Sequence, residues 1–182
     1  MEHFYQNIEG WFSYEYIYKD MIDQAEGENL FVEIGSYKGK SAAFMAVEII
    51  NSGKNIKFEC IDPMMLMGDY LNMPENEKMG YSAEEFHNRL LPVKDYYKLH
   101  QMTSVDASKL YADNSIDFIM IDGDHSYEGV YNDITNFLPK MRSGGLMTGD
   151  DAYSPQIIKA VQDAAKGLEV VSNGIHFFIS IP

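Results

Sequence analysis

Three aspartates follow short apolar runs in this sequence, and side chains of this type could hold a cation there. Asp122 comes directly after the stretch 116–121, and the pair Asp150 and Asp151 comes directly after the stretch 146–149. Any one of them could be an exposed turn acid, but carboxylates that meet at short range raise each other's pKa or recruit a metal ion. Oxygen ligands favour a hard ion such as Mg²⁺ or Ca²⁺ over zinc. Glu33 and Asp62 end apolar runs in the same way, so the acids at the ends of four such runs together predict a site for a hard cation.

His125 lies three residues after Asp122 and is the candidate general base. An imidazole beside carboxylates suits the removal of a hydroxyl proton near neutral pH. Asp122 is the second candidate catalytic residue. The remaining histidines are predicted to lack carboxylate neighbours, and these are His3, His87, His100 and His176.

A glycine turn follows the first apolar run, residues 29–34, and opens onto a helical pattern. Gly35 and Gly39 would let the backbone turn sharply and approach a ligand, with the free N–H groups of the next helix directed at it. Glu33 is costly inside an apolar strand unless a cationic or hydroxyl-rich ligand pairs with it. The pattern Gly-x-Gly-x-x-Gly is missing, which disfavours a nicotinamide oxidoreductase.

Asp62 ends the second apolar run, residues 56–61, and is followed by Pro63. An acid at this place takes the ribose hydroxyls of a bound nucleotide in many α/β proteins. An acid before proline is also a common turn former. Asp62 is a candidate binding residue because the glycine turn precedes it in the sequence.

The elements that must position these residues alternate between strands and helices, which predicts an α/β protein with a mostly parallel sheet. Strands are expected at 29–34, 56–61, 97–102, 115–121 and 146–149, with a C-terminal antiparallel hairpin at 168–171 and 175–181. Helices are expected at 41–50, at 82–91, after the segment 122–133 as far as about 141, and from Pro155 with Ser154 as cap. Residues 103–107 and 142–145 are expected to be turns. Because ligands bind beyond the carboxyl ends of parallel strands, the acids should meet in one crevice.

Two segments carry no motif, and the specificity for a substrate is expected to depend on them. Residues 1–28 are rich in aromatic side chains, with Ser13 as a helix N-cap, and either pack on the sheet or form a lid through Gly10, Trp11 and Phe12. Residues 63–95 form a variable, methionine-rich loop and helix that covers the sheet edge or gates a substrate.

Length and composition limit the classes of function. The 182 residues fit one domain, and Cys60, the only cysteine, is expected in the core of a protein from a reducing compartment. A formal charge of −14 and a pI near 4.6 disfavour nucleic acid as a partner. No stretch has the length of a membrane span or the order of a signal peptide, so a cytoplasmic protein is expected.

Residues 32–41, Val-Glu-Ile-Gly-Ser-Tyr-Lys-Gly-Lys-Ser, resemble motif I of the class I S-adenosylmethionine (SAM) methyltransferases in its glutamate form. The resemblance implies that this segment holds the methionine end of the cofactor, and that a later turn lies near the adenine. Its candidate cofactor-binding residues are Glu33, Gly35, Ser36, Gly39, Ser41, Asp62, Ser104 and Asp122. The implied fold is a Rossmann-like three-layer sandwich with a seven-stranded sheet.

The segment from Ile121 to Val130, then Gly144-Gly145, then 149–153, resembles the branch with metal-dependent macrolide and sugar O-methyltransferases and cephalosporin-hydroxylase-like proteins. Carried over by position, the resemblance makes Asp122, Asp150 and Asp151 ligands of Mg²⁺ and His125 the base. It implies one methyltransferase domain over 1–182 that methylates a hydroxyl of a small molecule, a sugar or natural product. A metal-independent methyltransferase and a non-catalytic SAM-binding module stay open, as does a homo-oligomer.

Overall fold

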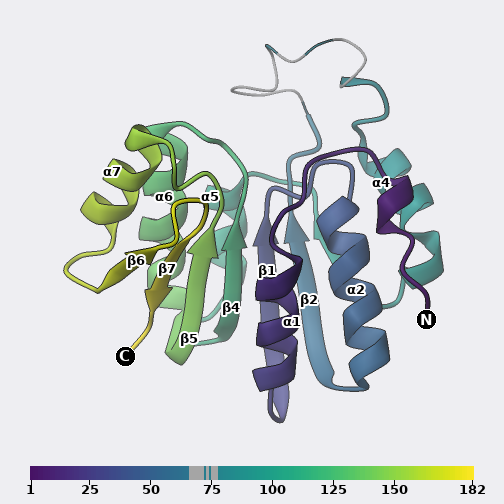
Figure 1. The fold of residues 1–182 in the computed structure, drawn as a ribbon, viewed down its shortest axis with the longest axis horizontal. Helices are drawn as coiled ribbons and strands as arrows, with labels where there is room; N and C mark the ends of the chain where they lie inside the picture. The colour runs from purple at the N-terminus through teal and green to yellow at the C-terminus, as the bar shows by residue number, and fades with distance from the viewer. Residues whose placement is uncertain (66–71, 73, 75–77) are drawn as a thin grey trace.

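The computed structural model describes residues 1–65, 72, 74 and 78–182. Within these residues one sheet contains seven strands in the order β3-β2-β1-β4-β5-β7-β6 (Figure 1). The strands are β1 (Glu28–Ile34), β2 (Asn55–Ile61), β3 (Lys98–His100), β4 (Ile116–Ile121), β5 (Met141–Gly149), β6 (Val170–Ser172) and β7 (Phe177–Ser180). The first five are parallel, and β7 runs antiparallel to both β5 and β6. This confirms the expected mostly parallel sheet with a C-terminal hairpin.

Helices cover both faces of the sheet, which gives three layers (Figure 1). The helices are α1 (Glu15–Gln24), α2 (Lys40–Ser52), α4 (Ala83–Arg89), α5 (Ser104–Ala107), α6 (Tyr127–Phe137) and α7 (Pro155–Ala164). Alternate strand residues serve opposite faces: Phe31 packs with α1, α2 and α4, whereas Val32 packs with α5, α6 and α7. Every residue of β4 is buried, as the continuous apolar run predicts for a central strand.

The order of the sheet reverses at β1, because this strand pairs with β2 on one side and with β4 on the other. The chain therefore continues from β1 to β2 on one side and from β4 to β5 on the other. A crevice opens between the two connections, beyond the carboxyl ends of β1 and β4. Asp122 N donates to Ile34 O at 2.8 Å, and Gly35 N donates to Ile61 O at 2.9 Å. These bonds bring together the ends of β1, β2 and β4, where the predicted site residues begin.

Three local predictions were wrong. Ser13 does not cap α1, because Tyr14 stands at the N-cap and the Ser13 hydroxyl lies 3.4 Å from His176 Nε2. Residues 104–107 form the short helix α5, since the Thr103 side chain accepts from Asp106 N and caps it. Residues 142–145 belong to β5 because the chain end pairs with them, with Gly144 N donating to Ile181 O.

The segment 63–95 is described in part. The predicted helix is confirmed as α4, capped by Ser82, which accepts from Glu85 N. The methionine-rich loop falls largely on residues 66–71, 73 and 75–77, which lie outside the described residues. Across the described chain, none of the helices has the length and apolar character needed to span a bilayer.

Candidate functional site

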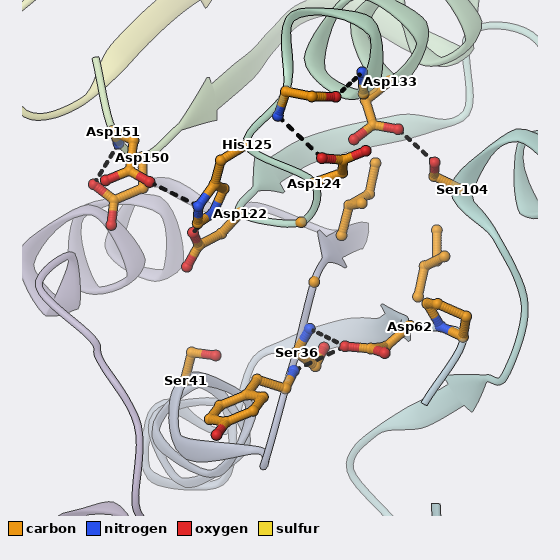
Figure 2. A pocket seen from close by; sticks show the side chains of 18 of the residues that line it. Ser36, Ser41, Asp62, Ser104, Asp122, Asp124, His125, Asp133, Asp150 and Asp151 are labelled. Atoms are coloured by element: carbon orange, nitrogen blue, oxygen red, sulfur yellow. Dashed lines mark hydrogen bonds and ion pairs between the residues drawn. The ribbon is translucent and has the colours of Figure 1, made fainter. Parts of the chain in front are cut away.

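A cavity of about 690 Å³ opens beyond the carboxyl ends of β1, β2, β4 and β5 (Figure 2). It is lined by nine of the residues singled out in the sequence: Gly35, Ser36, Ser41, Asp62, Ser104, Asp122, His125, Asp150 and Asp151. Gly10, Trp11 and Tyr14 of the N-terminal segment line it as well. Glu33 and Gly39 are the two predicted site residues that do not line it. The volume lies in the range of sites for small organic ligands, about 300–1,000 Å³.

The glycine turn brings the end of β1 against the end of β4. Gly35 has φ +85°, and a Cβ atom there would lie 2.1 Å from the carbonyl oxygen of Asp122. Gly39 has φ +89° and packs against Leu90 and Phe86, where a Cβ atom would meet Leu90 Cδ1 at 2.5 Å. Gly35 therefore permits the close approach at the cavity floor, and Gly39 permits the packing of α2 behind it.

Asp62 is buried and accepts four hydrogen bonds from its own chain. Oδ2 accepts from Ser36 N at 3.0 Å and Tyr37 N at 2.8 Å, and Oδ1 accepts from Met64 N at 2.8 Å and the Tyr81 hydroxyl at 2.6 Å. Burial raises the pKa of this carboxyl, and these donors oppose the rise. Asp62 thus orients the glycine turn, and ribose hydroxyls would have to share or replace its present donors.

Glu33 lies beneath the cavity and is fully buried. The Tyr18 hydroxyl donates to Oε2, whereas Oε1 has no hydrogen-bond partner among the described residues. Burial raises the pKa of Glu33 to about 7, and nearby hydroxyls of Ser36, Tyr18 and Ser41 limit that rise. An acid with one open oxygen in this position can accept from a ligand, directly or through a water molecule.

Asp122, His125 and Asp151 form the cluster best arranged for a metal ion among the described residues, with one donor atom from each within 4.8 Å of the others. His125 Nε2 lies 3.4 Å from Asp122 Oδ1, and Nδ1 lies 3.1 Å from Asp151 Oδ2. Asp151 has φ +59°, a left-handed conformation that turns its side chain toward the histidine from the end of β5. Figure 2 shows the imidazole between the two carboxylates.

Asp150 faces a different partner, His176, which stands just before β7. Asp150 Oδ1 lies 3.4 Å from His176 Nε2, and the Tyr16 hydroxyl lies 3.0 Å from His176 Nδ1. Burial raises the pKa of Asp150 to about 6, helped by the charge of Asp122. The predicted lack of carboxylate neighbours was wrong for His176, and also for His3 and His100, which contact Glu48 and Glu59. These contacts join residues far apart in the chain, so spacing gave no sign of them.

Asp133 is a buried acid in the cavity wall that the sequence did not single out. It lies on α6 and accepts from the Ser104 hydroxyl, which places the predicted Ser104 beside it (Figure 2). Burial raises its pKa to about 7, reinforced by the charge of Asp124. Its position one turn after Val130 and one before Phe137 on the buried face of α6 was the available signal.

Asp133→Asn is expected to become more stable relative to the wild type as the pH rises. The wild-type folded state holds a proton up to about pH 7, whereas the unfolded chain releases it near pH 4, so Asp133 costs stability through that window. Asparagine does not ionise and can still accept from Ser104. The difference in unfolding free energy, variant minus wild type, should rise by roughly 2–3 kcal/mol between pH 5 and pH 8 in urea titrations. Asp113→Asn, which changes an exposed acid, is the control. If the unfolding free energies of Asp133→Asn and the wild type changed with pH in parallel, Asp133 would not have a raised pKa in the folded protein.

A family model described as a methyltransferase domain matches residues 32–152. Among curated proteins, an uncharacterized protein of Acanthamoeba polyphaga mimivirus is 29% identical over 154 residues, covering 80% of this chain and 64% of that protein. An uncharacterized protein of Sinorhizobium fredii is 28% identical over 114 residues, covering 60% of this chain and 12% of that protein. The chain thus matches less than two thirds of the length of either relative.

Solved structures, among them two O-methyltransferases, share the fold at low sequence identity. The O-methyltransferase NovP has a TM-score of 0.72 and 16% identity, with 92% of this chain and 78% of that chain covered. Cofactor-bound Rv0187 from MTB has a TM-score of 0.63 and 15% identity, covering 94% and 83%. CalS11, a TDP-rhamnose 3'-O-methyltransferase of calicheamicin biosynthesis, has a TM-score of 0.60 and 12% identity, covering 91% and 76%. These likenesses concern the fold.

Proposed function

Since the chain belongs to the methyltransferase domain family, we propose that it transfers a methyl group from SAM to a hydroxyl group of a small molecule, a sugar or natural product. One observation carries the proposal: the glycine turn, Asp62 and the Asp122–His125–Asp151 cluster border the same cavity. We propose that residues 1–182 act as one methyltransferase domain, with 1–28 closing one side of the cavity.

The residues at the ends of β1 and β2 fit the cofactor. Gly35 and Gly39 shape the turn, Ser36 and Ser41 bring hydroxyls to it, and Glu33 has an open buried oxygen below. That oxygen suits the ammonium of the methionine end, while Asp62 would accept from the ribose and Ser104 would lie toward the adenine. SAM, when bound, supplies a methyl group on a sulfonium; the carbon–sulfur bond breaks as the carbon–oxygen bond of the product ether forms.

The acidic end of the cavity fits the acceptor hydroxyl. We propose that His125 takes its proton, and that Asp122 and Asp151 stabilise the imidazolium on either side. Asp122, Asp150 and Asp151 would hold a hard divalent cation, whose Lewis acidity lowers the pKa of a hydroxyl. A donor set of three carboxylates suits Mg²⁺ or Mn²⁺.

A metal-independent methyltransferase is the second candidate, and the placement of His125 favours it. The imidazole lies between Asp122 and Asp151, 3.4 Å and 3.1 Å from a carboxylate oxygen of each, so both carboxylates already have a polar neighbour without an ion. In this version the three side chains act as a base supported from both sides.

Calorimetric titration of the chain with S-adenosylhomocysteine, with and without Mg²⁺, and separately with NAD, tests the proposed function. Binding of S-adenosylhomocysteine and not of NAD is expected. A Mg²⁺ effect on that binding would favour the metal-assisted version. Binding of NAD alone would overturn the proposal.

Asp62→Asn is expected to weaken S-adenosylhomocysteine binding by roughly 1–3 kcal/mol, because an amide cannot accept from every donor that meets this carboxylate. The same titration measures it. Asp113→Asn removes an exposed carboxylate that pairs with Lys140 outside the cavity and should leave the affinity unchanged. Equal affinities for Asp62→Asn and the wild type would remove Asp62 from the cofactor site.

A further inference from the structure

Two tyrosines at the start of the N-terminal helix contact one acid that lines the cavity and one acid that is buried beneath it. Tyr14 at the N-cap and Tyr18 in α1 are four residues apart, so their side chains lie on the same face. The Tyr14 hydroxyl donates to Asp122 Oδ2 at 2.9 Å, and the Tyr18 hydroxyl donates to Glu33 Oε2. Both tyrosines are buried. One helix therefore contacts the carboxylates at the ends of both central strands, β1 and β4.

Each tyrosine hydroxyl binds one oxygen of its carboxylate and leaves the second oxygen for another contact. With Oδ2 of Asp122 held by Tyr14, Oδ1 lies 3.4 Å from His125 Nε2. With Oε2 of Glu33 held by Tyr18, Oε1 is the atom that has no hydrogen-bond partner among the described residues. The two hydroxyls thus fix which oxygen of each acid serves the cavity.

Packing alone does not require these hydroxyls. The Tyr14 ring packs edge-on against Phe12 and Tyr18, at centroid distances of 4.7 and 5.2 Å, and the Tyr18 ring packs against Phe118 at 5.8 Å. Phenylalanine would make the same ring contacts, and a buried hydroxyl costs free energy unless it is hydrogen-bonded. The hydrogen bonds to the two carboxylates, and not the ring contacts, therefore account for tyrosine instead of phenylalanine at these positions.

We infer that Tyr14 and Tyr18 are positioning residues for the two ends of the cavity: Tyr14 orients Asp122 for the cation and the base, and Tyr18 orients Glu33 for the cofactor. The inference rests on the proposed function. In this role the N-terminal helix orients acids of the site by hydrogen bonds, in addition to packing on the sheet or covering the cavity. Outer groups that hydrogen-bond to ligating side chains fix their orientation and tune their affinity.

Tyr14→Phe and Tyr18→Phe test this by affecting different ligands. Tyr14→Phe should weaken Mn²⁺ binding by about 10–100-fold while changing S-adenosylhomocysteine affinity less than about 3-fold. Tyr18→Phe should weaken S-adenosylhomocysteine by about 10-fold and leave Mn²⁺ binding unchanged. Calorimetry with each ligand alone gives both values without an acceptor, and thermal melts show that each variant is folded. If Tyr14→Phe does not fold, Tyr18→Phe still tests the separation of the two ends.

Tyr111→Phe is the matched control, because the Tyr111 hydroxyl donates to a carboxylate oxygen of Glu59 at 2.9 Å outside the cavity. It loses the same atom and the same kind of bond, and both affinities should stay at the wild-type values. The inference would be overturned if both variants lost affinity for Mn²⁺ and for S-adenosylhomocysteine to the same extent, or if neither variant lost affinity for any ligand. The proposed function would stand in both cases. A wild-type chain that binds neither ligand would overturn the proposed function and the inference together.

Discussion

Replacing His125 with alanine is expected to lower kcat by about 10²–10⁴ while SAM affinity changes little. A positioned general base contributes this much to a proton transfer, and His125 lies at the end of the cavity away from the glycine turn. An acceptor is first found by measuring S-adenosylhomocysteine release with a panel of hydroxylated sugars and phenols. Initial rates with that acceptor, and calorimetry with S-adenosylhomocysteine, then separate chemistry from binding.

His87→Ala provides the matched control for this experiment. His87 is exposed on α4, where its Nδ1 contacts the Tyr97 hydroxyl at 2.7 Å, and it does not line the cavity. Its replacement should leave kcat unchanged. A His125→Ala enzyme with kcat within about 3-fold of the wild type would exclude His125 as the base.

Asp151→Asn is expected to abolish most activity together with any dependence on Mg²⁺. An amide is a poorer ligand for a hard cation than a carboxylate, and the change also removes the charge beside His125 Nδ1. Asparagine tolerates the left-handed backbone at this position, so the fold should persist. Mn²⁺ affinity, measured by calorimetry, should fall at least about 100-fold, with S-adenosylhomocysteine affinity nearly unchanged.

Asp150→Asn distinguishes the two possible sets of ligands in the same measurement. If Asp122, Asp150 and Asp151 hold the ion, both asparagine variants should lose Mn²⁺. If Asp122, His125 and Asp151 hold it, Asp150→Asn should lose far less. Asp163→Asn, an exposed acid that pairs with Lys159 on α7, is the control. Unchanged Mn²⁺ affinity in Asp151→Asn would remove this residue from the metal centre.

The sheet was predictable because its strands have simple signals. The continuous apolar run at 116–121 became the fully buried β4. The predicted C-terminal hairpin also formed, although its strands span 170–172 and 177–180 instead of 168–171 and 175–181. Strand ends were harder to place. Thr103 started a helix through a side-chain cap, and the C-terminal Ile181 extended β5 backward by pairing with Gly145. Both effects depend on bonds that a hydrophobic pattern does not contain.

The sequence also located the acids at the strand ends, since the residues that come directly after parallel strands all lie at one edge of the sheet. It could not reveal their partners. Tyr14 contacts Asp122 across 108 positions of the chain, and Tyr16 contacts His176 across 160. Aromatic residues in an amphipathic helix look like core in a sequence, and only the packing of α1 on the sheet shows that their hydroxyls meet carboxylates.

A crystal structure of the chain grown with S-adenosylhomocysteine and Mn²⁺ tests the central claim most directly, because the anomalous signal of manganese locates the ion without a known acceptor. The account predicts the cofactor product along the glycine turn, with its ribose at Asp62, and a manganese peak between Asp122 and Asp151. Cofactor density with no manganese peak at these aspartates would leave the metal-independent version. Density for S-adenosylhomocysteine outside this cavity, or at no site, would contradict the account.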